Sequence, residues 1–403
     1  MRPLCGLALL ALFPQVVRPQ IAAPRAGAVV PGVEVLLTDS LHLVVGKRVG
    51  LITNHSGRDR KGTSTIDLLF RVPGVRLVAL FGPEHGLRGV AQAGEKVAST
   101  TDPATGVPVF SLYGDVQVPT PAMLKNVDVL VYDIQDVGAR VYTFEWTMAL
   151  AAKAANLPFI VLDRPDPIRA DRVEGNILDP KYASFVGQFP VALRYGLTAG
   201  ELLRYLVGTG EFEAQVTVVP MKGYQRSMWY DETGIPWVTP SPNLRNLDAA
   251  LLYTMTVFFE GTNVSEGRGT DDPFAQVGAS WLTDAGAIAA ELNGMRLPGL
   301  RFDSTSRQVQ PGFKFGGQTI PMVRVQVIDR NMVRAAESGV RLLRAIYARH
   351  AKDWQWNERQ FDRLAGSDEL RAAVEHGTLE ALVRKWHEQA RSFEAKRRPF
   401  LIY

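Results

Sequence analysis

The strongest constraint on the fold is a series of short apolar runs that alternate with helical segments between residues 47 and 167. Each run is almost continuously apolar, which is typical of parallel strands buried on both faces of a sheet. Strands that alternate with helices in this way predict a doubly wound, Rossmann-like layout. The expected strands cover residues 48–53, 75–81, 107–112, 127–134 and 158–163.

Polar clusters follow nearly every expected strand. In open parallel sheets, ligands bind beside the carboxyl ends of the strands, so these clusters should converge on one edge and form an active site. No GxGxxG motif follows the first strand and no GxxxxGK[ST] motif occurs, so the layout does not imply a bound nucleotide. The clusters are residues 54–56 (NHS), 82–86 (GPEHG), 133–138 (DIQDVG) and 163–167 (DRPDP).

The chain changes character after about residue 190. Thr198 and Glu201 fit a capping box in front of a helix over 199–207, and a long loop-rich region covers 223–246. Strands and helices then mix without a strict alternation. We therefore predict an α/β protein with a Rossmann-like parallel-sheet domain at 29–190 and a smaller α+β domain at 191–403. The active-site cleft is expected between the two domains.

Residues 1–28 resemble a secretory leader. Arg2 gives a positive start, residues 4–13 are mostly apolar, and alanines follow. The apolar run is too short to span a bilayer, and no later run is long enough to do so. We expect an exported protein, periplasmic or secreted, without stable membrane insertion. A misassigned start codon or a disordered N-terminus is the alternative.

Charge and cysteine content exclude other classes of protein. The formal net charge of +4 is spread along the chain, so it does not indicate nucleic-acid binding. The single cysteine, Cys5, rules out an intramolecular disulfide and a cysteine-based zinc cluster. No HExxH motif is present, so we predict no metal site.

The segment 260–270 (EGTNVSEGRGT) concentrates functional groups in a glycine-rich stretch. Glycines let the backbone approach a ligand, and exposed N–H groups together with Arg268 would hold an anion such as a carboxylate. The alternative is a glycine-rich turn in which Glu260 and Arg268 form a purely structural ion pair.

Five motifs in the same order resemble the exo-acting β-N-acetylmuramidases of the NamZ type. The resemblance runs from about Gly32 to Tyr403. It implies an enzyme, without cofactors, that removes N-acetylmuramic acid from the non-reducing ends of peptidoglycan fragments. It also implies that a Rossmann-like domain and a smaller domain enclose a cleft. The motifs are residues 81–89 (FGPEHGLRG), 131–143 (VYDIQDVGARVYT), 162–167 (LDRPDP), 241–243 (SPN) and 260–270.

Two other functions fit the same sequence. One is a non-catalytic cell-wall or sugar-binding protein that uses the cleft only for recognition. The other is a hydrolase for a different amino sugar. The expected partners in the main hypothesis are muramyl sugars derived from peptidoglycan, and the sequence does not indicate an oligomeric state.

Glycoside hydrolysis generally needs a carboxylic acid that protonates the leaving oxygen and a second group that acts as base or nucleophile. Glu84 is the first choice for the acid, because it directly follows a buried strand; a structural Glu84, capping a helix or paired with Arg88, is the alternative. Asp133 and Glu266 are the candidate partners, the latter from across the cleft. Substrate-assisted attack by the N-acetyl oxygen is a further alternative.

N-acetylmuramic acid differs from N-acetylglucosamine by a lactyl carboxylate, which a forked arginine would recognise. Each candidate arginine would equally suit a structural pair with a neighbouring aspartate. Amides, imidazoles and a tyrosine ring in the same clusters suit sugar hydroxyl, acetamido and ring groups. The predicted substrate-binding residues are Asn54, His55, His85, Asp136, Arg140, Tyr142, Asp163, Arg164, Asn243, Glu260, Asn263 and Arg268.

Overall fold

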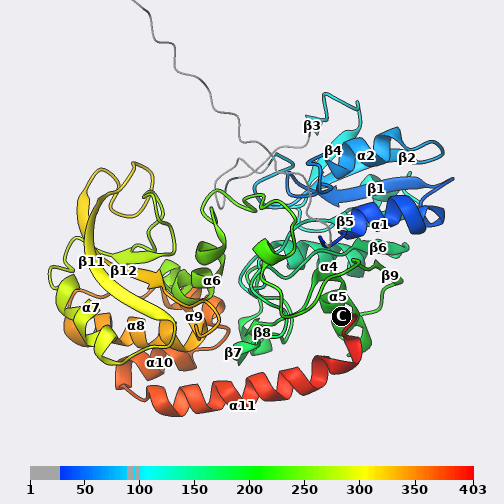
Figure 1. Ribbon diagram of the computed structural model, residues 1–403. Coiled ribbons are helices and arrows are strands. Elements are labelled where there is room, and N and C mark those ends of the chain that lie inside the picture. The colour runs from blue at the N-terminus through cyan, green and yellow to red at the C-terminus, as the bar shows by residue number, and fades with distance from the viewer. Residues whose placement is uncertain (1–27, 89–94, 96–99) are drawn as a thin grey trace, which may run out of the picture.

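The structure is a computed structural model that describes residues 28–88, 95 and 100–403. Figure 1 shows two lobes side by side, with a long helix near the C-terminus running beneath both of them. The expected leader at 1–28 lies outside the described residues except for Ala28.

The first lobe is built on a seven-stranded sheet. Every neighbouring pair is parallel except β3 and β4, which are antiparallel. The predicted Rossmann-like sheet is thus confirmed, with strand ends shifted by one or two residues. Its order is β3 (Thr100–Thr101), β4 (Pro108–Ser111), β2 (Arg76–Gly82), β1 (Arg48–Thr53), β5 (Val129–Asp133), β6 (Phe159–Leu162) and β9 (Val216–Val219).

Helices cover both faces of this sheet, as its apolar strands require. Val49 and Leu51 of β1 share a core with α1 (Gly32–Asp39) and α2 (Thr65–Arg71). Ile52, which points to the other face, belongs to the larger core that includes residues of the remaining helices of this lobe. Those are α4 (Phe144–Ala155) and α5 (Ala199–Gly208), and a short α3 (Pro121–Leu124) precedes β5.

The second lobe packs helices against a small antiparallel sheet. The sheet has the order β10 (Gln276–Gly278), β12 (Thr319–Val327) and β11 (Leu300–Gln308). Its core is continuous with the larger core of the first lobe, so apolar side chains join the two lobes. The helices are α6 (Leu247–Thr256), α7 (Ala285–Gly294), α8 (Ala335–His350), α9 (Glu358–Ala365) and α10 (Glu369–His376).

The C-terminal segment returns to the first lobe. Helix α11 (Leu379–Arg397) packs on the two-stranded sheet of β7 (Glu174–Ile177) and β8 (Ala192–Arg194). The Tyr403 hydroxyl then donates a hydrogen bond to Asp163 at the end of β6. Because β9 also belongs to the first sheet, chain beyond residue 190 contributes to both lobes. The domain division at residue 190 stays a prediction.

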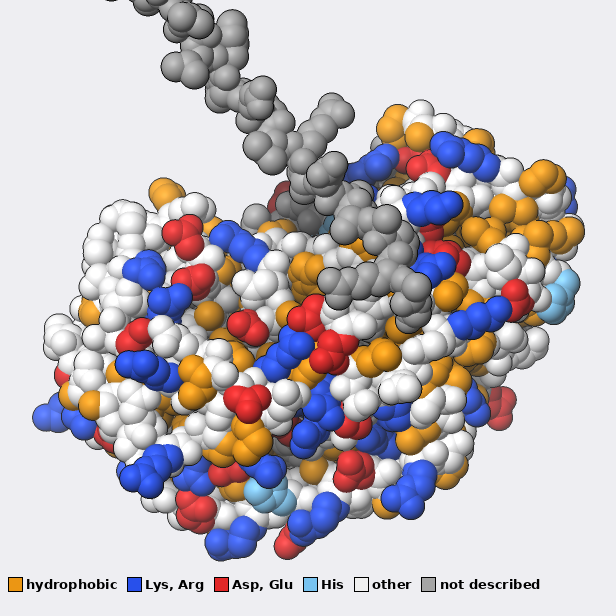
Figure 2. Space-filling model, viewed as in Figure 1, with side chains coloured by type: hydrophobic (Ala, Val, Ile, Leu, Met, Phe, Trp, Pro, Cys, Tyr) orange, Lys and Arg blue, Asp and Glu red, His pale blue; other side chains and the backbone are white. Residues whose placement is uncertain are grey.

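Short 3₁₀ helices complete the chain. They are η1 (Leu41–Leu43), η2 (Pro180–Tyr182), η3 (Tyr230–Glu232), η4 (Val257–Gly261) and η5 (Arg398–Phe400). The face of the molecule in Figure 2 carries acidic and basic side chains intermixed, in line with the small net charge.

Candidate active site

A cavity of about 370 Å³ lies between the two lobes. This volume is at the lower end of the range for small-molecule sites, and it suits a sugar better than a folded partner. The described lining residues are Glu84, His85, Tyr113, Val141, Tyr142, Thr143, Phe185, Val186, Ser241, Asn243, Leu244, Tyr253, Glu260, Arg268, Phe274, Gln360 and Leu364.

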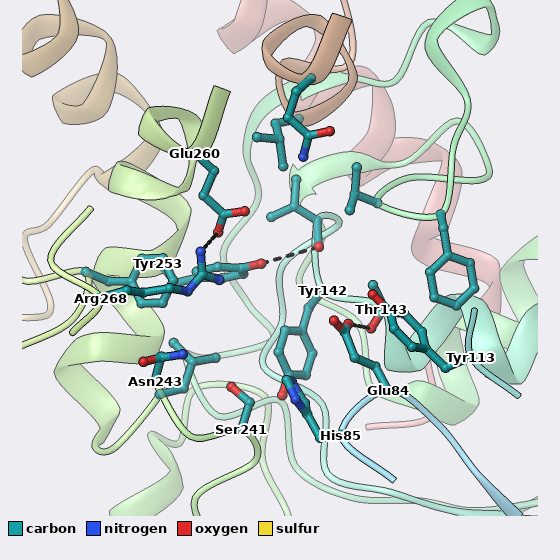
Figure 3. A pocket seen from close by; sticks show the side chains of 17 residues that line it. Glu84, His85, Tyr113, Tyr142, Thr143, Ser241, Asn243, Tyr253, Glu260 and Arg268 are labelled. Atoms are coloured by element: carbon teal, nitrogen blue, oxygen red, sulfur yellow. Dashed lines mark hydrogen bonds and ion pairs between the residues drawn. The ribbon is translucent and has the colours of Figure 1, made fainter. Parts of the chain in front are cut away.

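Glu84 forms part of the first-lobe wall. It follows β2, and the next two residues, His85 and Gly86, both adopt left-handed backbone angles with φ of 68° and 69°. Residues other than glycine adopt this conformation infrequently, and those that do are often found at functional sites. The Thr143 hydroxyl donates to Glu84 Oε2 over 2.6 Å, which fixes the carboxyl at the cavity (Figure 3).

Glu260 and Arg268 form the opposite wall, in the second lobe (Figure 3). Arg268 Nη1 lies 2.8 Å from Glu260 and 3.1 Å from Glu266. Glu266 also pairs with Lys314 Nζ at 3.3 Å, so two cations balance two carboxylates. The closest contact in each of these two ion pairs of Arg268 is made by Nη1.

The two glutamates of this cluster differ in proton affinity. Burial raises the pKa of Glu260, and the nearby charge of Glu266 adds to this effect against the opposing pull of Arg268. Burial also disfavours ionised Glu266, but Lys314 and Arg268 outweigh it and lower the pKa of that carboxyl. Glu260 is therefore the stronger base of the two, and it is the one that lines the cavity.

Glycines in the 260–270 segment allow this arrangement. Gly267 and Gly269 have φ of 83° and 81°, where residues with side chains are strained. A Cβ on Gly269 would also come within 2.7 Å of the Phe313 ring. The Arg268 guanidinium lies 4.9 Å from the centroid of the Phe274 ring, which holds its plane beside the cavity.

Neutral polar groups lie between the two walls. In Figure 3, Tyr142 and Ser241 lie between Arg268 and Glu84, and Asn243 lies on the Arg268 side. The Tyr142 ring packs edge-on against Phe144, with centroids 4.7 Å apart, so its orientation is fixed. His55 lies outside the cavity, but its Nε2 is 2.7 Å from the Thr239 carbonyl oxygen and supports the loop that leads to Ser241.

Asp133 and Arg164 do not line the cavity. They lie at the carboxyl ends of β5 and β6 and bind one another, with Arg164 Nε 2.5 Å and Nη2 2.9 Å from the two carboxylate oxygens. The Thr65 hydroxyl also donates to Asp133. Both side chains are almost fully buried, so this crevice in the sheet is filled by the protein's own ion pair.

Asp136 and Arg140 also lie outside the cavity. Asp136 accepts hydrogen bonds from the Tyr195 hydroxyl and the Gly138 amide. Arg140 is fully buried, and burial lowers its pKa to about 9. Its guanidinium donates to carbonyl oxygens of both lobes, at distances of 2.8 Å for Asn176 and 2.9 Å for Ala365.

Three other predicted residues bind structural partners instead. Asn54 binds the Ser56 hydroxyl and amide, and Asn263 binds the backbone of Asp353. Glu266 holds Arg268 from behind the cavity wall. The predicted residues that the structure brings together at the cavity are Glu84, His85, Tyr142, Asn243, Glu260 and Arg268.

Asp163 supports the fold and gives it a testable pH dependence. It is fully buried and accepts hydrogen bonds from the Thr198 hydroxyl, the Gly200 amide and the Tyr403 hydroxyl. Burial raises its pKa from the ordinary 3.8 to about 7, although these hydrogen bonds oppose the shift. The folded state thus retains a proton that the unfolded chain releases. The resulting stabilisation is complete below pH 3.8 and is lost as the pH rises through about 7.

We expect Asp163→Asn to flatten this dependence. The unfolding free energy of the wild type, relative to the variant, should fall between about pH 4 and about pH 8. Urea unfolding at several pH values measures it. Asp128→Asn is the matched control, because Arg48 holds the pKa of that surface carboxyl at about 2. An Asp163 variant that parallels the wild type over this range would contradict the assignment.

Several residues that line the cavity are not among those predicted from the sequence. Tyr113 follows the expected strand at 107–112, so the rule that placed Glu84 at a strand end would also have found it. Thr143 and Ser241 fall inside matched motifs, but nothing distinguished them from their neighbours. Phe185 and Gln360 carry no local signal, because only the packing of the lobes brings them to the cavity.

In the part of the chain that the structure describes, no group of three or more His, Cys, Asp or Glu side chains is arranged to hold a metal ion. None of the helices in that part is both long and apolar enough to span a membrane.

The chain matches two protein-family models, which together cover most of its length. The model described as "Exo-beta-N-acetylmuramidase NamZ, N-terminal" matches residues 49–248, and the corresponding C-terminal model matches residues 251–403. The chain belongs to the NamZ family. It is 43% identical over 378 residues to the peptidoglycan beta-N-acetylmuramidase NamZ of Bacillus subtilis, covering 92% of this chain and 91% of that protein.

Two solved structures from Bacteroides fragilis, both described as DUF1343 family proteins, share the fold of this NamZ family member. The first has a TM-score of 0.87 and 36% identity, covering 94% of this chain and all of the other. The second has a TM-score of 0.73 and 29% identity, covering 93% of this chain and 99% of the other. The match therefore extends over both lobes.

Proposed function

We propose that this chain is an exo-acting glycoside hydrolase that releases N-acetylmuramic acid from the non-reducing ends of peptidoglycan fragments. Membership of the NamZ family and the likeness to the Bacillus subtilis enzyme support this function. The observation that carries it is the meeting of Glu84 from one lobe with Glu260 and Arg268 from the other at one sugar-sized cavity.

The geometry suggests which groups carry the reaction. Glu84 protonates the glycosidic oxygen as the bond from that oxygen to the anomeric carbon breaks. Glu260 is its partner carboxyl in preference to Asp133 or Glu266, since of these three only Glu260 lines the cavity. Its raised pKa makes it a better acceptor for the proton of the attacking water, whose oxygen bonds to the anomeric carbon.

Arg268 is proposed to recognise the lactyl carboxylate. Of the described residues that line the cavity, it is the only lysine or arginine. It lines the cavity, and its closest contacts to Glu260 and Glu266 are both made by Nη1. Arg140 and Arg164, the other sequence candidates, are committed to backbone carbonyls and to Asp133, respectively.

The assay that tests this function compares two substrates. The wild type should hydrolyse a chromogenic β-N-acetylmuramic acid glycoside at least about 100-fold more efficiently than the N-acetylglucosamine glycoside. In Arg268→Lys the ratio of the two kcat/KM values should drop about tenfold, because the forked donor is lost while the charge remains. The ratio is the readout, since a change in Glu260 alone affects both substrates. Equal wild-type rates would refute recognition of the lactyl group.

Export completes the proposal. The leader-like residues 1–28 support transport to the periplasm or the cell exterior, where peptidoglycan lies. N-terminal sequencing of the protein recovered from the culture medium or the periplasm tests this, and an intact Met1 in that fraction would argue against cleavage of a leader.

A further inference from the structure

Two half-buried aromatic rings line the cavity and are not used by the proposed chemistry. Tyr113 follows β4, and Phe185 lies shortly after η2. Their ring centroids are 5.7 Å apart, with planes inclined at 53°. Tyr142 and Phe274, which line the same cavity, are buried. Tyr113 and Phe185 are only half-buried, so part of each side chain is accessible at the cavity.

The turn that carries Phe185 departs from ordinary turn chemistry. Ser184 and Gly187 exchange two backbone hydrogen bonds, of 2.8 and 3.0 Å, and close a two-residue turn with Phe185 and Val186 at its tip. Such turns favour Gly, Asn and Asp. Here both tip residues are apolar and both line the cavity. Apolar side chains presented in this way indicate a surface that contacts a ligand.

The position of this turn is fixed by the buried Arg140. A Cβ on Gly187 would lie 3.5 Å from Arg140 Cδ, so the turn rests directly on that side chain. Arg140 is held in turn by the carbonyl oxygens of Asn176 and Val191, at 2.8 and 3.1 Å. A surface anchored this way is preorganised, and ordering it on binding costs little.

The direction of cleavage decides which sugar meets the rings. In the proposed function, the lactyl group faces Arg268 and the glycosidic oxygen faces Glu84. The leaving sugar must then extend beyond Glu84, away from Arg268. Figure 3 shows Tyr113 beside Glu84 and on the side away from Arg268, and Phe185 contacts Tyr113.

We propose that Tyr113, Phe185 and Val186 form the subsite for the leaving sugar, a neutral 2-acetamido pyranose whose apolar C–H face rests on the two rings. Pyranoses present such faces, and aromatic side chains provide matching flat apolar area. The subsite rests on the proposed function, because it takes the direction of the bond from it. With this subsite, the protein recognises both of the sugars that the cleaved bond joins.

The test separates the two sugars by measuring their binding independently. Tyr113→Leu and Phe185→Leu keep apolar volume but remove a ring face. We expect the Kd of N-acetylglucosamine, measured by NMR titration, to rise about tenfold in each, while the Kd of N-acetylmuramic acid changes less than about twofold. Tyr113→Phe restores the ring and should weaken binding less than Tyr113→Leu.

A matched control and two adverse outcomes make this decisive. Phe70 is a ring that is 46% exposed on α2, outside the cavity, so Phe70→Leu should change neither Kd. Equal weakening of both sugars, or unchanged Kd values in both variants, would overturn the assignment of the subsite. Failure of the proposed function shows separately, as absent hydrolysis of the muramic acid glycoside by the wild-type chain.

Discussion

Replacing Glu84 by Gln should lower kcat on the N-acetylmuramic acid glycoside by about 10²- to 10⁴-fold, the usual contribution of a general acid. Glutamine keeps the shape of the side chain and can still bind Thr143, whose hydroxyl contacts Glu84 Oε2 at 2.6 Å. It cannot supply the proton that the leaving oxygen needs. The Kd of N-acetylmuramic acid should therefore stay within about threefold of the wild-type value.

This experiment also decides between an enzyme and a binding protein. A protein that only recognises sugars would show no wild-type turnover to lose, and Glu84→Gln would scarcely change its affinity. Thr143→Val is the matched comparison, because it leaves the carboxyl in place and removes one hydrogen bond. We expect a loss of about tenfold for that variant. Turnover by Glu84→Gln within threefold of the wild type would show that another group is the acid.

Glu260→Gln should give the second large effect, a drop in kcat of about 10³-fold. Burial raises the pKa of Glu260, which increases its strength as a base, and the amide has no such basicity. Steady-state kinetics on the muramic acid glycoside measure the loss. Glu260→Ala tests the assignment further, because it vacates the side-chain volume and lets a small external anion such as azide or formate occupy the space and replace the missing carboxylate.

The controls for this prediction are the two carboxyl groups that the sequence alone put forward as partners. Glu266→Gln and Asp133→Asn should reduce kcat by less than about tenfold and act mainly on stability, because each breaks a buried ion pair, with Lys314 and Arg164 respectively. Thermal unfolding measures that cost. If Glu266→Gln abolishes turnover while Glu260→Gln retains it, the roles assigned to the two residues are reversed.

The sequence predicted the sheet well because the signal for a buried parallel strand is local. Residues 49–52 form a continuous apolar run, and the structure has β1 at Arg48–Thr53. Capping is equally local: Thr198 accepts a hydrogen bond from Glu201 N at the start of α5, as expected. These features depend on residues that are near one another in the chain.

The candidate site was only partly predictable because its composition depends on long-range partners. The polar side chains after the strands lie at one edge of the sheet, as expected. Asp133 and Arg164, however, saturate one another there, and no spacing rule reveals that pairing. Glu84 escapes this because the residues that follow β2 reach the cavity between the lobes. The turn at Phe185 and Val186 had no signal at all, since its role depends on the cavity that it faces.

The contacts of Arg140 restrict movement of the two lobes relative to one another. Its buried guanidinium binds carbonyl oxygens of both Asn176 and Ala365 and so links the lobes. Separating the lobes would leave this buried charge without its hydrogen-bond acceptors, at a cost of several kcal/mol. We therefore expect the two lobes to keep their relative position through turnover. A glycan strand would then enter the cavity by its free end, and an internal segment of the strand would not fit between the lobes.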